Sequence, residues 1–325
     1  MAKAARVPIA VAGGETLLGR ELLELLAKAP FAGEVTQYTT AAPVARKAGE
    51  PDVMPPLASA DLKATPVIFL ASVESGDLSG LRKKTIIDVC GVLEHFPEAR
   101  LRAPQAELVN PGKASGIQVI AHPAAIALAL ALKEIHRISA IRRSVVLIFE
   151  PASERGQAGI EELQKQTVGL LSFKKLPQEI YDAQVSFNLL PRYGEDAPLA
   201  LEEIELKIER HLASLLTNPG SIPMPSLRLV QAPVFHGYSF SLWVEFENNP
   251  GPDALISGLT SERIDVRKPD EEPPTNVGTA GQSGITIGAI TVDRNYARAC
   301  WLWVVADNFR LAAENALEVA REALQ

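Results

Sequence analysis

The chain has 325 residues, of which 47% are hydrophobic and 22% are charged, and this composition excludes an intrinsically disordered protein. Its length is sufficient for two domains of ordinary size. Its net charge of −7, from 32 Lys and Arg against 39 Asp and Glu, argues against a general binder of nucleic acid or of anionic membranes, so neither is expected as a partner.

Cysteine and histidine are scarce in this sequence. The two cysteines, Cys90 and Cys300, cannot form a disulfide framework or a multi-cysteine zinc site, and no pair of the five histidines has useful ligand spacing. We therefore expect no metal centre, and the low cysteine content is typical of a cytoplasmic protein. No run of about 18 uncharged apolar residues occurs, so no transmembrane helix is expected.

The first elements follow the order strand, glycine-containing turn and helix. The apolar run 7–12 predicts a strand, residues 13–19 (Gly-Gly-Glu-Thr-Leu-Leu-Gly) predict a turn, and the leucine spacing after Arg20 predicts an amphipathic helix. Further strands, short and apolar on both faces, are predicted at 34–39, 67–71, 85–89 and 118–120. This order is typical of a Rossmann-type, doubly wound parallel α/β domain.

The pattern changes after Pro123. In the segment 226–247, apolar and polar residues alternate over a run that is too long for a short parallel strand. Helices are predicted over 124–135, 159–171, 199–216 and 310–324, and strands within 138–150, 285–292 and 301–306. Before the last helix, these elements are typical of an α+β domain.

Several separated motifs, kept in order along nearly the whole chain, resemble those of the aspartate-semialdehyde dehydrogenase family, and in particular of its catalytically degenerate Usg-like branch. The motifs are the turn 13–19, Ile86-Ile87-Asp88, Val109-Asn110-Pro111, Phe187-Asn188-Leu189-Leu190-Pro191, Ala232-Pro233-Val234-Phe235 with Gly237, and the run 302–310 (Leu-Trp-Val-Val-Ala-Asp-Asn-Phe-Arg).

The resemblance implies an architecture and a chemistry. It implies a Rossmann-type domain over 1–122 plus 306–325, to which the last helix returns, and an α+β dimerisation domain over 123–305. Members of the family act in amino-acid biosynthesis: they form a thioacyl-enzyme on a cysteine, transfer a hydride to NADP and use phosphate to release an acyl phosphate. A homodimer is therefore expected, and it would help to bury Trp243, Trp301 and Trp303.

The sequence departs from the family at its catalytic positions. The resemblance places Ala125 at the nucleophilic cysteine, Tyr238 at the acid/base histidine and Glu150 at the glutamine beside the nucleophile. An alanine has no heteroatom that can form a thioester. A phenol with an ordinary pKa of about 10 is a poor proton shuttle at neutral pH.

The substrate contacts are altered as well. Gln231 stands where the family has the arginine that holds the substrate carboxylate, and Glu94 stands where it has a phosphate-binding arginine. The second exchange replaces attraction of an anion with repulsion. We therefore expect an inactive homologue with a binding or regulatory role.

Two displaced side chains keep an alternative open. Cys90 follows the predicted strand 85–89, at the edge where α/β folds bind ligands, and His236 would share a strand face with Tyr238. The alternative is an oxidoreductase with altered chemistry that uses Cys90, or His236 in a cluster with Glu150 and Tyr238. The competing interpretation is a small buried residue at a strand end for Cys90, and a polar residue at a sheet surface for His236.

The dinucleotide site is weakened in this sequence. Gly13 and Gly19 keep two glycines of the turn, but Thr16 replaces the middle one and crowds the approach of a pyrophosphate. Glu15 places a negative charge where phosphate would lie, and it is itself a candidate to cap the following helix.

Any bound dinucleotide is expected to be NADP, because no acidic residue follows the second strand to hold a free ribose 2′-hydroxyl. Candidate contacts for a 2′-phosphate are Thr39, Thr40, Arg46 and Lys47, although the last two also fit solvated loop charges. In the family, the position of Asn308 faces the nicotinamide, and a short polar side chain there also suits the turn after the preceding strand.

Overall fold

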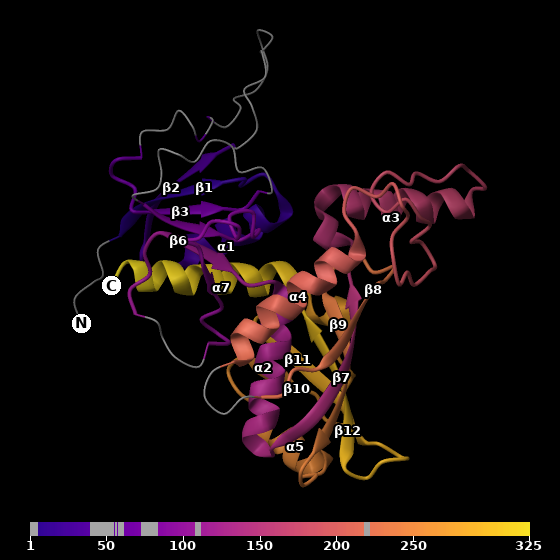
Figure 1. Cartoon of the computed structure of the whole chain (residues 1–325). Coiled ribbons are helices and arrows are strands. Elements are labelled where there is room, and N and C mark those ends of the chain that lie inside the picture. Colours follow the sequence, from indigo (N-terminus) through magenta and orange to yellow (C-terminus); the bar gives the residue numbers. More distant parts are fainter. Residues whose placement is uncertain are drawn as a thin grey trace. The chain divides into compact units, whose positions relative to one another are not determined.

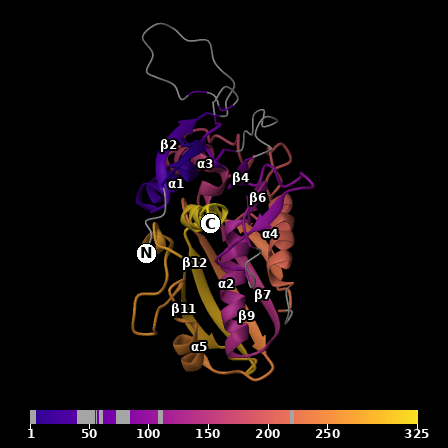
Figure 2. The same cartoon turned by 90° about the vertical axis from the view of Figure 1, so that its left-hand side faces the viewer.

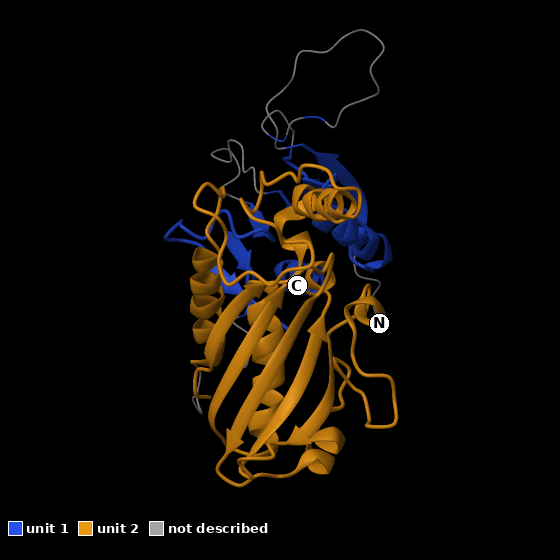
Figure 3. Ribbon diagram, turned by 90° about the vertical axis from the view of Figure 1, so that its right-hand side faces the viewer, with its two compact units in different colours: residues 1–121, 312–325 blue, residues 122–311 orange. Residues whose placement is uncertain are grey.

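The chain divides into two compact units. The computed structural model describes residues 6–39, 55, 57, 62–72, 84–107, 112–217 and 222–325 (Figure 1). Unit 1 comprises residues 1–121 and 312–325, and unit 2 comprises residues 122–311 (Figure 3). The sequence-based division had its boundaries after residue 122 and before residue 306.

Unit 1 contains a six-stranded sheet in the order β2-β1-β3-β4-β6-β5, in which every pair is parallel. The strands are β1 (Val7–Ala12), β2 (Ala32–Tyr38), β3 (Val67–Leu70), β4 (Thr85–Asp88), β5 (Arg100–Arg102) and β6 (Ile117–Ile120), and helix α1 (Leu17–Lys28) follows β1. The central strands β3 and β6 are buried along their whole length. This sheet confirms the predicted Rossmann-type fold class.

The two edge strands of this sheet differ from the sequence prediction. β2 was expected to be apolar on both faces, but only its first residue is buried, and β2 is an edge strand that pairs with β1 alone. β5 was not predicted, since its sequence, Arg-Leu-Arg, is short and charged. Edge strands need fewer apolar residues than central ones, so their sequence signal is weaker.

The last helix, α7 (Asn308–Ala323), begins in unit 2, and its residues from Ala312 onward belong to unit 1. Within unit 1, the buried Arg102 guanidinium contacts Glu107 and also Glu322, with 2.6 Å between Arg102 Nη2 and Glu322 Oε2. The Gln105 backbone N–H donates to Asn315 Oδ1 (3.0 Å). These contacts fix the end of the chain to the parallel-sheet unit.

Unit 2 contains a mixed six-stranded sheet in the order β10-β11-β12-β9-β7-β8. Its strands are β7 (Ile141–Glu150), β8 (Ser226–Gln231), β9 (Tyr238–Phe246), β10 (Ile264–Val266), β11 (Ile285–Val292) and β12 (Ala299–Ala306), and its helices are α2 (Pro123–Ile138), α3 (Gly156–Leu171), α4 (Leu201–Leu216), α5 (Pro252–Leu259) and the short α6 (Asn276–Thr279). Helices α2 and α4 lie in front of this sheet in the view of Figure 2, and in the opposite view of Figure 3 no helix of the described residues covers the middle of the sheet. This arrangement confirms the predicted α+β class.

The alternating run 226–247 is two strands, not one. β8 pairs in parallel with β7, and β9 pairs with β7 in the antiparallel sense. The chain reverses between them at Gly237, whose φ of 82° lies in the left-handed region that glycine tolerates. Alternation alone does not reveal such a break, because the pattern resumes after the turn.

None of the helices in the described residues has the length and apolarity that crossing a membrane requires.

Candidate functional site

The start of α2 carries the position that the motifs assign to the nucleophile. His122 is the N-cap residue: its Nδ1 accepts from the Ala124 N–H (3.3 Å), and Pro123 occupies the first turn. Ala125 is fully buried, as are its helical neighbours on every side. Burial, together with the charges of Lys207, His211 and Arg155, lowers the pKa of His122 well below its usual value, so this imidazole is neutral. The helix start is an apolar core element.

Glu150 ends β7 with a carboxyl group that is completely buried. Arg155 Nη2 and the Tyr193 hydroxyl oxygen lie 3.3 Å and 3.2 Å from Glu150 Oε1, and the Tyr238 hydroxyl donates to Glu150 Oε2 at 3.5 Å. Burial raises the pKa of Glu150 to about 7, although Arg155 opposes this rise. Glu150 is therefore poised to change its protonation state near neutral pH.

A second carboxylate, Glu154, lies beside the same arginine. Its Oε1 accepts from Asn308 Nδ2 (2.8 Å), and its Oε2 is 3.7 Å from His122 Nε2. Burial also raises the pKa of Glu154, against the opposing charge of Arg155. Arg155 is thus the cation that acts on both the buried Glu150 and the partly buried Glu154, and the neighbouring negative charges hold its own pKa above the usual value in spite of burial. We refer to Glu150, Glu154, Arg155, Tyr193 and Tyr238 as the Glu150 cluster.

Gln231, at the end of β8, has a side-chain amide whose nitrogen and oxygen both form hydrogen bonds within the protein. Its Nε2 donates to the backbone oxygens of Glu150 and Ala232, both at 2.9 Å, and its Oε1 accepts from the Tyr193 hydroxyl at 2.7 Å. The side chain is buried. A substrate carboxylate could bind it only by displacing one of these bonds, each of which is costly to leave unmade in a buried site.

Tyr238 is equally unsuited to proton transfer. It is fully buried, and its ring stacks on Phe240. Burial, with Glu154 and Glu150 nearby, raises the pKa of its phenol well above the usual value of 10. At neutral pH, Tyr238 is a permanent hydrogen-bond donor to Glu150.

His236 does not join Glu150 and Tyr238, contrary to the expected shared strand face. β9 begins only at Tyr238, and the turn at Gly237 reverses the alternation on which that expectation was based. Instead His236 Nδ1 lies 3.2 Å from Ser153 Oγ, and its Nε2 lies 2.9 Å from Asp307 Oδ2. Both ring nitrogens therefore have protein partners.

The contacts that link Ser153, His236 and Asp307 resemble the catalytic triad of a hydrolase, but the serine is inaccessible. Ser153 Oγ is buried and also lies 3.2 Å from Asn308 Nδ2. Burial alone would raise the pKa of Asp307, but hydrogen bonds from His236, Arg310 and Gly281 outweigh it and lower that pKa. A nucleophile must reach its substrate, so this chain of contacts is better suited to holding the start of α7 than to catalysis.

Asn308 supports the turn that precedes it. Besides its bonds to Ser153 and Glu154, its Oδ1 accepts from the Gly237 N–H (3.2 Å), and the residue is buried. Its donors and its acceptor all have protein partners, which agrees with the structural interpretation of its motif.

In unit 1, the glycine turn is closed by Thr16, and not by Glu15 as considered from the sequence. Thr16 is the N-cap of α1: its Oγ1 accepts from the Gly19 N–H (2.9 Å) and lies 2.8 Å from the Ala71 carbonyl oxygen. Glu15 precedes the cap and is exposed. Gly19 is required by close packing, since a Cβ there would lie 2.1 Å from the Gly13 oxygen. The turn keeps its fold, and the Thr16 hydroxyl accepts a hydrogen bond from the Gly19 N–H at the start of α1.

The other predicted residues of unit 1 are only partly constrained. Cys90 is half-buried just beyond β4, and its backbone N–H donates to Asp88 Oδ1 (3.0 Å), while Glu94 is half-buried further along the same loop. The Thr39 N–H donates to the Pro55 oxygen. Several expected positions lie outside the described residues: Thr40, Arg46, Lys47 and the motif 109–111. Among the residues that are described, no group of three or more His, Cys, Asp or Glu side chains could hold a metal ion.

The Glu150 cluster contains residues that the sequence did not single out for this role. Tyr193 lies 43 positions from Glu150 along the chain, and no motif predicts their contact.

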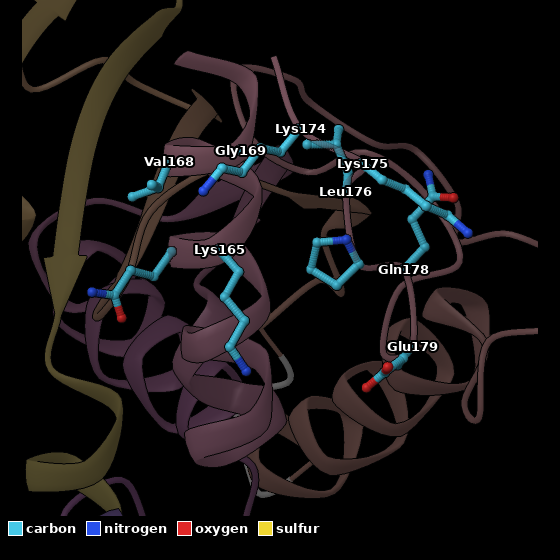
Figure 4. Close-up of a pocket in the computed structure, with 10 residues that line it drawn as sticks. Lys165, Val168, Gly169, Lys174, Lys175, Leu176, Gln178 and Glu179 are labelled. Atoms are coloured by element: carbon cyan, nitrogen blue, oxygen red, sulfur yellow. The ribbon is translucent and has the colours of Figure 1, made fainter. Parts of the chain in front are cut away.

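Two further features lie apart from the Glu150 cluster. Cys300, expected to be a packing residue, is buried, and its thiol donates to Asn249 Oδ1 (3.4 Å). A pocket of about 890 Å³ lies between α3 and the segment 174–179, away from every predicted site residue (Figure 4).

Comparisons with known proteins agree with the motif-based resemblance. The aspartate-semialdehyde dehydrogenase of Rickettsia bellii is 26% identical over 98% of this chain and 97% of its own length. A USG-1 protein homolog of Azotobacter vinelandii is 28% identical over 72% of this chain and 71% of its own length.

Solved structures show the same fold. A probable aspartate-semialdehyde dehydrogenase from Pseudomonas aeruginosa has a TM-score of 0.82 at 24% identity, over 97% of this chain and 98% of that one. A Candida albicans aspartate semialdehyde dehydrogenase solved with NADP has a TM-score of 0.66 at 16% identity, over 98% of both chains.

The sequence profile of the semialdehyde dehydrogenase dimerisation domain matches residues 132–311. This match spans more than half of the sequence and confirms the resemblance, so the chain belongs to the semialdehyde dehydrogenase family.

Proposed function

We propose that this chain is a non-catalytic member of its family, a cytoplasmic homodimer with a binding or regulatory role. The observation that carries the proposal is Ala125, fully buried within the first turn of α2 at the position that the resemblance gives to the nucleophilic cysteine. The family reaction passes through a thioester, and the methyl group of Ala125 has no heteroatom that can form one.

The neighbouring contacts support the same proposal. Gln231 and Asn308 have their polar atoms engaged within the protein, and Glu150 is paired with Arg155. A substrate carboxylate at these positions would meet two acids, Glu150 and Glu154, and one arginine whose charge already acts on both. In a catalytic site such polar groups stabilise the transition state, whereas here they bond to other groups of the protein.

An activity assay tests this proposal. With aspartate semialdehyde, NADP⁺ and phosphate, the purified protein is expected to form no NADPH above the rate without protein. An enzyme of ordinary efficiency turns over at roughly 1–1,000 s⁻¹, so even strongly reduced catalysis would be visible. Phosphate-dependent NADPH formation that scales with protein concentration would end the proposal.

We also propose that NADP binding is weak, because Thr16 occupies the place of the middle glycine and its hydroxyl takes the Gly19 N–H. Thr16→Gly is expected to bind NADP⁺ about tenfold more tightly than the natural chain, as one crowding contact is removed and one N–H is freed. Isothermal titration calorimetry measures both constants. Thr16→Ser keeps the capping hydroxyl and serves as the control; equal affinity in all three proteins would contradict the prediction.

A second candidate function rests on Cys90. It is half-buried just beyond the carboxyl end of β4, where parallel sheets bind ligands, so an oxidoreductase with altered chemistry could use its thiol. His236 is a weaker substitute, because Ser153 and Asp307 engage both of its ring nitrogens. This candidate requires that Cys90→Ser abolish a reductase or dehydrogenase activity of the protein.

The homodimer is supported by the helix-free face of the unit 2 sheet, which we call the outer face. Val145 on β7, Trp243 on β9 and Trp301 on β12 are aligned across it, with Leu147 and Trp303 in the next row. Val145, Leu147 and Trp301 are exposed, although monomers rarely leave so large an apolar patch uncovered. The family's dimerisation profile covers this sheet.

Trp301→Asp is expected to weaken dimer formation by at least about a hundredfold, because an isologous interface contains the added charge twice. Analytical ultracentrifugation over a range of concentrations measures the dissociation constant. An unchanged dimer in this variant would place the interface elsewhere on the chain.

A further inference from the structure

The pocket between helix α3 and residues 174–179, which we call the α3 groove, has a volume of about 890 Å³ (Figure 4). Lys165, Val168 and Gly169 line it from α3, and Leu176 lines it from the facing segment. Small-molecule sites in proteins have volumes of about 300–1,000 Å³, so this groove is large enough to hold a ligand. None of the residues that the motifs assign to the family's site lines it.

The groove arises because the chain reverses at the end of α3 and returns along the helix. Phe173 follows the C-cap, Ser172, with a φ of 55°, and the Lys174 N–H donates to the Gly169 oxygen (2.9 Å). Gly169 lets the returning segment lie close to the helix, because a Cβ at this position would be 3.0 Å from Leu176 Cδ2. Gly169 and Leu176 are thus the place where the two walls of the groove meet.

Buried polar contacts hold the returning segment in place. Gln166, buried on α3, donates from Nε2 to the Pro177 oxygen (2.8 Å). Glu162, one turn earlier and also buried, accepts from the Glu179 N–H (2.8 Å). A site whose walls are already ordered loses less conformational entropy when a ligand binds. The fold therefore forms the α3 groove before any ligand arrives.

Part of the lining is apolar and open to water. Val168 is 55% exposed, and Leu176 and Pro177 are half-buried. These side chains lie together in the groove, so one ligand can cover all three. Covering them removes apolar surface from water, which favours a ligand that has an apolar part.

The charge of the lining is positive, although the whole chain has a net charge of −7. Lys165, Lys174 and Lys175 line the groove, against Glu179 as the one carboxylate among its lining residues (Figure 4). Lys165 Nζ lies 3.3 Å from Glu161, but both side chains are exposed, and such pairs are weak. Lys174 and Lys175 form no ion pair with the part of the chain that the structure describes. A local excess of positive charge favours an anion.

We propose that the α3 groove binds a small amphipathic anion, namely a carboxylate that carries an unbranched acyl chain. The acyl chain covers Val168, Leu176 and Pro177, and the carboxylate pairs with the lysines of the lining. A single chain is the fitting occupant, because the groove is walled on two sides. The inference goes beyond the proposed function and is independent of it, since the groove contains none of the positions at which catalysis is lost.

Isothermal titration calorimetry of the full chain with decanoate, below its micelle concentration and at neutral pH, tests the ligand class. Acetate has the same head without the chain, and decylammonium has the chain with the opposite charge. Decanoate is expected to bind at least about a hundredfold more tightly than acetate and about tenfold more tightly than decylammonium. Absence of decanoate binding, or equal binding of decanoate and decylammonium, would overturn the inference.

Substitutions in the lining test the location of the site. The combined change of Lys165→Gln, Lys174→Gln and Lys175→Gln is expected to weaken decanoate binding about tenfold, and Val168→Ser alone about threefold. All four positions lie on the surface, so the fold is expected to tolerate these changes. Lys268→Gln is the matched control, an exposed lysine of unit 2 outside the groove, and it is expected to leave the affinity unchanged. Unchanged affinity in the triple variant would place the ligand elsewhere and overturn the inference.

Two other occupants of the groove would give different results. A second copy of the chain would compete with the ligand, so Trp301→Asp would then bind decanoate more tightly than the natural chain, whereas we expect equal affinities. A lipid surface would carry the protein down with sedimented phosphatidylglycerol vesicles, whereas we expect it to stay in solution. Either result overturns the inference and leaves the proposed loss of catalysis standing. Phosphate-dependent NADPH formation in the activity assay would end only that proposal.

Discussion

Replacing Arg155 with alanine is expected to destabilise unit 2 by about 3–5 kcal/mol at pH 8. Removing the guanidinium leaves the buried Glu150 carboxylate without its ion-pair partner and the partly buried Glu154 without the same nearby positive charge. Breaking a buried ion pair from one side costs this much because the remaining charge can neither be solvated nor paired. The loss is expected to be smaller at pH 5, where Glu150, with a pKa of about 7, is already protonated.

Urea denaturation followed by tryptophan fluorescence measures this effect, since all three tryptophans, Trp243, Trp301 and Trp303, belong to unit 2. Arg192→Ala is a matched control, because Arg192 is an exposed arginine of the same unit, and its loss is expected to change stability by less than about 0.5 kcal/mol. Equal, small effects of both substitutions, independent of pH, would mean that the Glu150 cluster does not depend on its arginine.

Glu150→Gln is expected to change the pH dependence of stability. In the natural chain the folded state holds a proton on Glu150 up to a pKa of about 7, whereas the unfolded chain releases it near 4.5. Between these values the folded state binds more protons, so the contribution of this group to stability falls as the pH rises from about 4.5 through 7. The difference amounts to about 3 kcal/mol.

The glutamine variant lacks this titration. Relative to the natural chain, Glu150→Gln is expected to gain about 3 kcal/mol of stability between pH 4.5 and pH 8. The comparison of the two proteins at each pH cancels the titration of groups that do not interact with Glu150. The account would be contradicted by a constant difference across the range, or by a variant that loses stability relative to the natural chain as the pH rises.

Much of the fold was predictable because its elements carry strong local patterns. β11 was predicted with its observed bounds, and the cores of α2, α3, α4 and α7 followed from leucine and alanine spacing. Errors concentrated where a local pattern is weak or continuous: the short charged edge strand β5, and the alternation across Gly237 that joins β8 to β9. There the outcome depends on sheet neighbours that a sequence window does not contain.

For the candidate site, motifs give positions along the chain: they align Ala125 and Gln231 with residues of the family's site, and this assignment stays a prediction. The pairing of Glu150 with Arg155 and Tyr193 was not predicted, because it depends on how β7, the residues before α3 and the loop that contains Tyr193 meet in space. The cap of α1 illustrates the same limit: Glu15 and Thr16 are neighbours, and only backbone geometry decides which side chain meets the Gly19 N–H.

Thioester trapping tests the central claim most directly. The protein is incubated with aspartate semialdehyde and NADP⁺ in the absence of phosphate, so that any acyl-enzyme accumulates, then quenched in acid and weighed intact by mass spectrometry. The account predicts only the unmodified chain, with no NADPH formed and with both Cys90 and Cys300 still free thiols. A stoichiometric acyl adduct, formed together with an equal amount of NADPH, would contradict it.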